Sequence, residues 1–242
     1  AFVVLFFIPI ADPEMGKTTS DTVFEHSPWA FRHFVLGAIA IFVYVGVEVG
    51  IPGTLIYYLS DTTGLGGGLP KATATAIADS VAATYWFLML IGRFIAGFIA
   101  SKISSKTLMS CTTVLAMILI TTAIVLGKSA AVSMPVFTGS AFNMVAVPVS
   151  ALLLVLCGLC TSVMWPCIFN LATEGLGKYT EPASGIFMMM VVGGGLLPLL
   201  QNFIADQSGY LVSYFVPLAG VAYMCFYTLI GSKNVNKDIP VD

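Results

Sequence analysis

Glu48 is an acidic residue placed near the middle of a long apolar run, from Phe34 to Leu59. The run is long enough to cross a hydrocarbon layer about 30 Å thick. A carboxylate at that depth costs about 2.5–3.5 kcal/mol on insertion scales, and such residues usually face a bundle interior or a water-filled path, where they handle an ion or a proton. We therefore interpret Glu48 as a functional residue inside a membrane. The alternative is a neutral side chain that only hydrogen-bonds a neighbouring helix.

Tyr44 lies four residues before Glu48, so the two side chains share one helix face. Gly46 and Gly50 thin the same helix, and Pro52 removes a backbone hydrogen bond because it has no N–H. A thin, kinked helix that carries an acid suits the moving wall of a cavity. The pattern predicts that Glu48 hydrogen-bonds a ligand hydroxyl or exchanges a proton there.

Two further candidates lie in a later apolar run. Asn170 offers both a donor and an acceptor, which suits a ligand rich in hydroxyls. Trp165 carries a flat ring that can stack on such a ligand. Each also has a structural interpretation, Asn170 as an interhelical hydrogen bond and Trp165 as part of the interfacial aromatic belt. Together they extend the candidate site to a second span.

The composition is that of an integral membrane protein. The 242-residue chain is 58% hydrophobic and 9% charged, with a mean hydropathy of +0.96, whereas a soluble domain carries roughly 25% charged residues. The net charge of −2 and the lack of a basic run give no indication of a nucleic-acid partner, and we expect none. Cys157 and Cys160 form a C-x-x-C without a nearby His or further Cys, so we expect packing residues, no metal and no cofactor.

Hydropathy divides the chain into four segments. Residues 1–11 are apolar but too short to span and lack the features of a signal peptide, so we interpret them as the tail of a preceding transmembrane helix. Residues 12–33 form a polar inter-domain loop, residues 34–231 a six-helix domain and residues 232–242 a polar tail. The predicted fold is an all-α membrane protein, a six-helix transmembrane bundle. Its spans are residues 34–59, 76–100, 107–127, 147–172, 183–205 and 210–231.

Lysine and arginine lie mostly on one side of this bundle. Eight fall on the side that holds the loop and the C-terminus, against Lys71 and Lys128 on the other. The eight are Lys17, Arg32, Arg93, Lys102, Lys106, Lys178, Lys233 and Lys237. Because positive residues accumulate in cytoplasmic loops, the loop and the C-terminus are predicted to be cytoplasmic. We expect His26 and His33 to be solvated at this edge.

The six spans form two sets of three that cross the bilayer in opposite senses. The first span of each set carries a late proline, Pro52 and Pro166, and the third of each set has no charged residue. Such an arrangement is typical of inverted repeats, which place binding sites near the membrane midplane at the repeat interface. The sequence therefore predicts two inverted three-helix repeats.

Several stretches resemble one family, the sugar/proton symporters of the major facilitator superfamily that include the L-fucose permease and the bacterial glucose/galactose transporters. Residues 42–49 resemble the start of that family's seventh helix, residues 165–180 its tenth helix and following loop, and residues 193–201 its eleventh helix. The resemblance covers nearly the whole chain. It implies the C-terminal half of a twelve-helix transporter beside a missing N-terminal six-helix half.

A looser match falls between the second and third spans. Gly97, Lys102 and Lys106 resemble the superfamily's G-x-x-x-D-R-x-G-R-K cytoplasmic loop, in which Ser101 and Ser104 depart from the expected Asp and Gly. The resemblance implies that the basic residues here set topology and gating. We expect Arg93, which precedes them, to act in the same way by pairing with an acid when the cytoplasmic side closes. Glu174 is one such acid.

The family implies secondary active transport of a monosaccharide of the glucose, galactose or fucose class by alternating access, coupled to a proton, in the bacterial inner membrane. Spans one, two, four and five are then expected to line the cavity, and the third and sixth to face lipid. The motif of the eleventh helix implies a cavity role for Gln201. Whether Glu48 binds the sugar or exchanges a proton stays open.

Two other functions compete with transport. A membrane scaffold or sensor could be built on the same fold without transporting anything. A membrane-embedded enzyme needs a Ser–His pair, paired aspartates or H-E-x-x-H inside the membrane. Both histidines lie at the edge, no two acids share a span core, and the zinc motif is missing from the sequence. We therefore expect no enzymatic activity.

Overall fold

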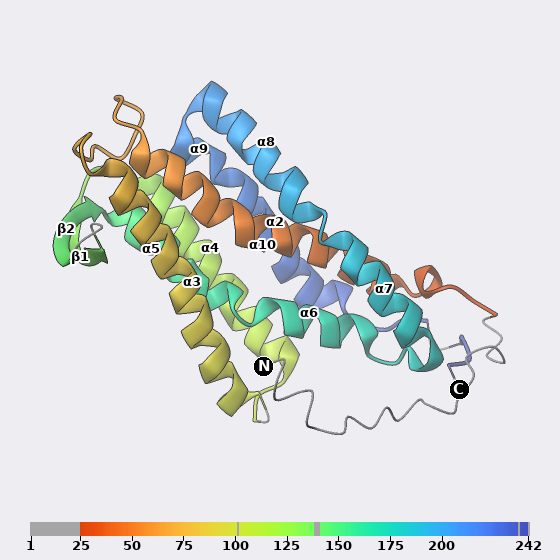
Figure 1. Cartoon of the computed structure of the whole chain (residues 1–242). Helices are drawn as coiled ribbons and strands as arrows, with labels where there is room; N and C mark the ends of the chain where they lie inside the picture. The colour runs from red at the N-terminus through yellow and green to blue at the C-terminus, as the bar shows by residue number, and fades with distance from the viewer. Residues whose placement is uncertain (1–24, 101, 138–140, 237, 242) are drawn as a thin grey trace, which may run out of the picture.

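The computed structural model describes residues 25–100, 102–137, 141–236 and 238–241. It contains six helical spans that are long and apolar enough to cross a membrane (Figure 1). Their bounds are Arg32–Ser60, Ala74–Ile99, Ser105–Leu126, Val149–Thr173, Gly177–Ser208 and Tyr210–Gly231. Each predicted span is present, and the chain is a multi-pass integral membrane protein. The tail predicted at residues 1–11 lies outside the described residues.

The first span is the single helix α2 (Arg32–Ser60), which follows a short 3₁₀ turn, η2 (Pro28–Ala30). Its apolar run can only be stable in lipid if the backbone bonds internally, as a helix does. α2 begins before the predicted residue 34, and this places His33 in the bundle. The expectation that His33 is solvated is wrong, because its side chain is fully buried and its Nε2 lies 3.0 Å from the Glu174 carbonyl oxygen.

Two continuous helices follow, α3 (Ala74–Ile99) and α4 (Ser105–Leu126). Ser104 caps α4, since its Oγ accepts a hydrogen bond from the Thr107 amide at 3.2 Å. The helix ends at Gly127, whose φ of +53° lies in the region that favours glycine. The connection between α3 and α4 is short, because α3 ends at Ile99 and α4 begins at Ser105. The end of α3 and the start of α4 therefore lie on the same side of the bundle.

A β-hairpin links the third and fourth spans, where the sequence predicts only a connection with helix breakers. β1 (Ala131–Phe137) pairs antiparallel with β2 (Phe142–Pro148). Met134, Val136 and Val147 are buried, and the Phe137 amide donates to Ser80 Oγ at 2.9 Å. The hairpin is thus packed against the first half of α3, and it adds a small sheet to an otherwise helical fold.

The fourth and fifth spans are broken, unlike the first three. The fourth consists of α5 (Val149–Thr161) and α6 (Met164–Thr173), and the fifth of η3 (Gly177–Tyr179), α7 (Thr180–Met190) and α8 (Gly193–Ser208). Pro166 cannot donate to the carbonyl of Ser162, which lies in the first break. The second break is followed directly by glycines, which weaken a helix.

The sixth span consists of α9 (Tyr210–Ser213), α10 (Phe215–Phe226) and a final π-helical turn, η4 (Tyr227–Gly231). In the π-turn the Ser232 amide donates to the Tyr227 carbonyl at 2.7 Å. The wider turn ends the span at Gly231, as predicted.

Contacts between the spans follow a two-fold pattern. The first span packs on the fifth (α2 on α8) as the fourth packs on the second (α5 on α3). The first also packs on the sixth (α2 on α10) as the fourth packs on the third (α5 and α6 on α4). Exchanging the two sets of three maps these contacts onto one another, as inverted repeats require. The contact between α2 and α3 is the exception, because the fourth and fifth spans have no contact of comparable size. In Figure 1, α3, α2 and α8 lie toward the viewer, with α4 and α10 behind them.

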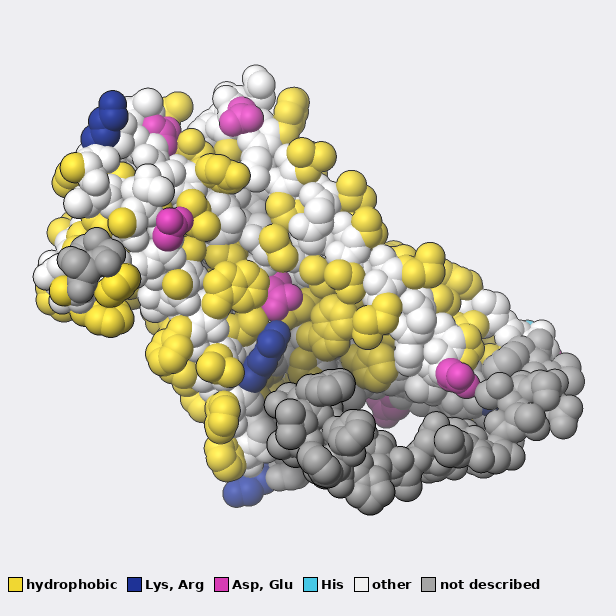
Figure 2. Space-filling view, in the orientation of Figure 1, with side chains coloured by type: hydrophobic (Ala, Val, Ile, Leu, Met, Phe, Trp, Pro, Cys, Tyr) yellow, Lys and Arg dark blue, Asp and Glu magenta, His cyan; other side chains and the backbone are white. Residues whose placement is uncertain are grey.

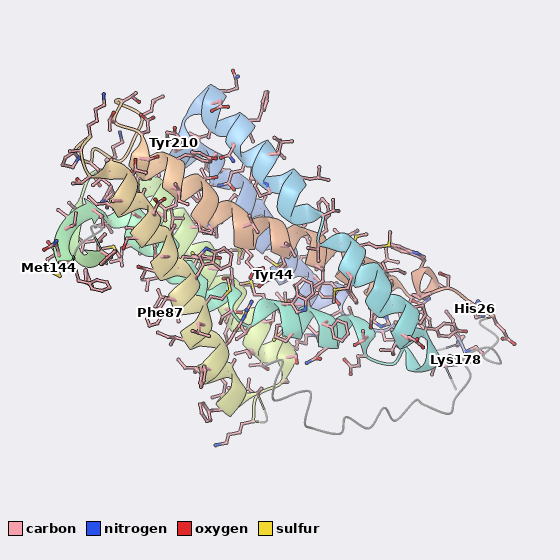
Figure 3. The ribbon with its side chains drawn as sticks, viewed as in Figure 1. His26, Tyr44, Phe87, Met144, Lys178 and Tyr210 are labelled. Atoms are coloured by element: carbon pink, nitrogen blue, oxygen red, sulfur yellow. The ribbon has the colours of Figure 1, made fainter. Side chains whose placement is uncertain are left out.

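Polar and basic groups close the two ends of the bundle, whereas its sides are apolar (Figure 2). At one end, Lys106 Nζ donates to the Leu229 carbonyl and the Arg32 amide donates to Asn236 Oδ1. At the opposite end, Lys128 Nζ donates to the Gly64 carbonyl. Figure 3 shows Phe87 of α3 on the outside of the bundle and Tyr44 of α2 near its middle, away from both ends.

Candidate functional site

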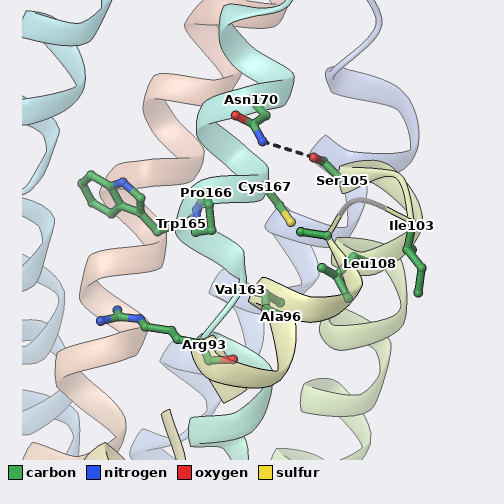
Figure 4. A pocket seen from close by; sticks show the side chains of 13 residues that line it. Arg93, Ala96, Ile103, Ser105, Leu108, Val163, Trp165, Pro166, Cys167 and Asn170 are labelled. Carbon is green, nitrogen blue, oxygen red and sulfur yellow. Dashed lines mark hydrogen bonds between the residues drawn. The ribbon is translucent and has the colours of Figure 1, made fainter. Parts of the chain in front are cut away.

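A hollow of about 570 Å³ opens between the second half of α3, the start of α4 and α6 (Figure 4). Its volume lies within the range of small-molecule pockets, about 300–1,000 Å³. Arg93, Trp165 and Asn170 line it, together with mostly small and apolar side chains. Three of the candidates taken from the sequence therefore line a single hollow, although they come from two separate spans.

Glu48 and Arg93 form an ion pair at the edge of this hollow. Arg93 Nη2 lies 3.3 Å from Glu48 Oε1 and joins α3 to α2. The Glu48 side chain is only 14% exposed, whereas that of Arg93 is 54% exposed. Figure 2 shows an acidic and a basic side chain meeting in the middle of a mainly apolar face. Glu48 thus has a cation beside it within the membrane spans.

Tyr44, one helix turn before Glu48, contacts the tryptophan that lines the hollow. Its hydroxyl donates to the Thr161 carbonyl at 3.1 Å, and Thr161 Oγ1 lies 3.0 Å from the hydroxyl of Tyr85. The Tyr44 ring meets the Trp165 ring edge-on, with centroids 6.0 Å apart. Tyr44 is fully buried. Its ring packs against Trp165, and its hydroxyl bonds to the C-terminal end of α5.

Asn170 lies where the first hollow meets a second one. It lines both, and its Nδ2 donates weakly to Ser105 Oγ at 3.4 Å. The second hollow, of about 770 Å³, is more polar and includes Lys106, Glu174 and Lys233. The exposed Asn170 amide can exchange its long hydrogen bond with Ser105 for a hydrogen bond with a ligand.

Gln201 lies apart from the other candidates. It is buried in α8, where it packs on Gly50 of α2, and its Nε2 has no hydrogen-bond partner among the described residues. Its neighbour Asn202 accepts a hydrogen bond from Thr54 Oγ1 at 3.1 Å. Neither hollow described above includes Gln201.

The basic candidates occupy different positions. Arg93 lies inside α3, more than one turn before its end, and its acidic partner in this conformation is Glu48 rather than Glu174. Lys102 is exposed in the turn after α3, and Lys106 lies at the start of α4, bonded to the last span. Arg93 is thus brought to the membrane-embedded candidates, whereas the two lysines stay at the bundle end.

The structure adds residues that the sequence did not single out. Ser105 contacts Asn170, and Cys167 and Val163 line the hollow beside Trp165. No pattern in the sequence singles out these three residues, because they meet the candidates only through the packing of α3, α4 and α6. Among the described residues, no group of three or more His, Cys, Asp or Glu could hold a metal ion.

No protein-family model matches the chain. It is 36% identical over 210 residues to a glucose/galactose transporter of Brucella abortus, covering 87% of this chain and 45% of the relative. It is 32% identical over 236 residues to a putative glucose/galactose transporter of Helicobacter pylori, covering 95% of this chain and 50% of the relative. An L-fucose-proton symporter of Escherichia coli is 25% identical over 178 residues, covering 74% of this chain and 35% of the relative.

Among solved structures, the fold is similar to that of FucP, a major facilitator superfamily transporter in the outward conformation. The TM-score is 0.64 at 21% sequence identity, over 84% of this chain and 43% of FucP. The chain spans about half the length of the curated relatives it matches. Over most of its length the chain is therefore similar in sequence to about half of these sugar transporters, and its fold is similar to that of about half of FucP.

Proposed function

We propose that this chain is the C-terminal six-helix half of a twelve-helix transporter that moves a monosaccharide by alternating access, coupled to protons. One observation carries the proposal. The membrane-embedded acid Glu48 pairs with Arg93, whose guanidinium lines a hollow together with an indole and an amide. Such groups accept from, donate to and stack on a sugar. The names of the related proteins support a hexose or fucose as the cargo and a proton as the coupling ion.

The exposed surface supports a second six-helix half. Spans two and five are the least buried of the six, and their outward faces are apolar. Spans one, two and four also carry Glu48, Arg93 and Trp165. A partner half that covers this face would enclose the site between two bundles, as repeat-built transporters do.

The charge distribution supports a placement in the bacterial inner membrane with the C-terminus in the cytoplasm. Among the described residues, the end that holds the hollow carries Arg32, Lys102, Lys106, Lys178 and Lys233, against Lys71 and Lys128 at the other end. The positive-inside rule assigns the first end to the cytoplasm. The hollow then faces the cytoplasm.

The test is uptake of labelled hexoses and fucose into vesicles by the full-length transporter that contains this chain. Uptake should be saturable, should be driven by an inward proton gradient and should fall when a protonophore collapses that gradient. Glu48→Gln should change the affinity, the rate or the pH dependence of uptake. If wild-type vesicles take up none of these sugars under any gradient, transport is ruled out and a scaffold or sensor on the same fold becomes the better assignment.

A further inference from the structure

We propose that Arg93 contacts the sugar directly and that Glu48 is its positioning partner, so that the pair recognises an uncharged sugar as one unit. This inference rests on the proposed transport function. It moves Arg93 from a gate at the cytoplasmic end, as the sequence suggests, into the binding site.

The two charges of the pair have unequal surroundings. Glu48 is held on α2 with little exposure, while more than half of the Arg93 side chain is exposed. Arg93 lines the hollow, and Glu48 does not. The carboxylate is therefore the fixed end of the pair, and the guanidinium is the end that faces a ligand.

Arg93 keeps hydrogen-bonding capacity while it is paired. Its contact with Glu48 runs through one nitrogen, Nη2, at 3.3 Å. A guanidinium carries five N–H donors in a rigid fork. Donors therefore remain for the hydroxyl groups of a sugar, and the carboxylate holds the fork in place.

An aromatic ring lies on the same side of the hollow. Figure 4 shows Arg93 reaching from α3 and Trp165 from α6 toward the same side, with Asn170 farther along α6. Tyr44 supports the indole from behind. A pyranose lying against the indole would present its rim hydroxyls to Arg93.

A purely structural role explains the pair less well. A contact through one nitrogen at 3.3 Å, with half of the Arg93 side chain exposed, is a weak link between two helices. Two charges within membrane spans are costly, and they are usually kept for function. The pair also has no net charge, so the site suits a neutral hexose and disfavours a sugar phosphate or a uronic acid.

The test measures KM for hexose uptake and thermal midpoints of the purified full-length transporter. Arg93→Lys keeps the charge and loses the fork, so KM should rise about tenfold while the thermal midpoint stays that of the wild type. Glu48→Gln leaves the guanidinium unpaired, and it should raise uptake of glucuronate relative to glucose. Lys71→Gln and Asp79→Asn, which remove an exposed cation and an exposed acid elsewhere, should change neither quantity.

The double variant Glu48→Gln/Arg93→Gln separates binding from packing. It should restore any stability that a single neutral substitution loses, because no unpaired charge is left, yet hexose KM should stay high. A double variant with wild-type KM, or Arg93→Lys with wild-type KM, would overturn the inference and leave the pair as a helix bridge. Absence of hexose uptake by the wild type would instead overturn the proposed function, and the inference with it.

Discussion

The two faces of α2 differ in how much room they leave for a ligand. On one face, Gly46 and Gly50 let α8 approach so closely that a methyl group at either position would collide with Leu197 or Gln201. On the opposite face, Glu48 reaches across to Arg93 beside an open hollow. Because residues two apart on a helix point in nearly opposite directions, this contrast follows from the alternation of glycine and acid along one segment.

The comparison shows that a polar side chain in a span is not by itself a binding residue. Glu48 and Gln201 both lie in apolar runs and both match family motifs. Glu48 is paired with Arg93, which lines a hollow, whereas Gln201 is buried between two helices. Close helix packing through small residues is what holds membrane helices together, so the α8 face is best suited to stability.

The largest expected effect concerns the packed face. A Cβ at Gly193 would overlap the carbonyl oxygen of Phe42, and backbone atoms cannot move aside as a flexible side chain can. Gly193→Ala should therefore destabilise the α2–α8 contact by about 1–3 kcal/mol. The measurement is the thermal midpoint and the yield of monodisperse protein in detergent.

A matched control lies in the same helix turn. Gly195 has no neighbour within 4 Å of a built Cβ, so Gly195→Ala should leave the thermal midpoint unchanged or raise it slightly. If Gly193→Ala and Gly195→Ala lowered the thermal midpoint equally, the glycines would provide helix flexibility rather than close packing.

The next effect concerns the open face. Trp165→Ala removes the ring that lines the hollow and its contact with Tyr44. Aromatic stacking is worth about 0.5–1.5 kcal/mol, so hexose KM should rise roughly two- to tenfold. Trp165→Phe should recover part of the loss, since it keeps a ring in place.

Trp86 provides the control for this substitution. It lies on α3, half exposed, with its ring edge-on to Tyr85 at 5.4 Å, and it does not line the hollow. Trp86→Ala should leave hexose KM unchanged. A similar rise in KM from both tryptophans would remove the distinction between the hollow and the rest of the apolar surface.

The sequence predicted the spans well because each is a long apolar run between polar connections. In lipid, a single segment can satisfy its backbone hydrogen bonds only as a helix, so a long apolar run predicts a helix there. The shared face of Tyr44 and Glu48 follows from their four-residue spacing in the same way. The hairpin strands, Ala131–Phe137 and Phe142–Pro148, are not predicted from the sequence, because β2 buries only its last two residues and β1 contains Pro135, a helix breaker.

The tertiary features could not be predicted from one sequence. The pairing of Glu48 with Arg93 depends on how α2 crosses α3, and residues 45 positions apart carry no local signal of contact. The burial of His33 depends on where α6 ends, because its partner is the Glu174 carbonyl. The predicted cavity role of Gln201 rests on a motif that gives the identity of the residue but not the direction in which its side chain points.

A smaller effect is expected at the far end of the hollow. Asn170→Ala removes an amide whose bond to Ser105 is long, at 3.4 Å. A hydrogen bond of this kind is worth about 0.5–1 kcal/mol, so hexose KM should rise roughly two- to fivefold without a change in thermal midpoint. Asn202→Ala, on the packed face, should lower the thermal midpoint and leave hexose KM unchanged. It loses the hydrogen bond from Thr54, and Asn202 lines neither of the two hollows described above. If Asn202→Ala also raised KM, the ligand would have to contact α8 as well.

The smallest effect is expected at Gln201, which the sequence predicts to be a cavity residue and the structure buries between α2 and α8. Its Nε2 is buried without a partner, and a buried donor that makes no bond costs free energy. Gln201→Met keeps the length of the side chain and removes that donor, so the thermal midpoint should stay the same or rise, and hexose KM should stay within about twofold of wild type. A large rise in KM at unchanged stability would instead mean that α8 swings away from α2 during transport and exposes this amide to the sugar. Gln201 would then belong to the site in a conformation in which the glycine-packed face has opened.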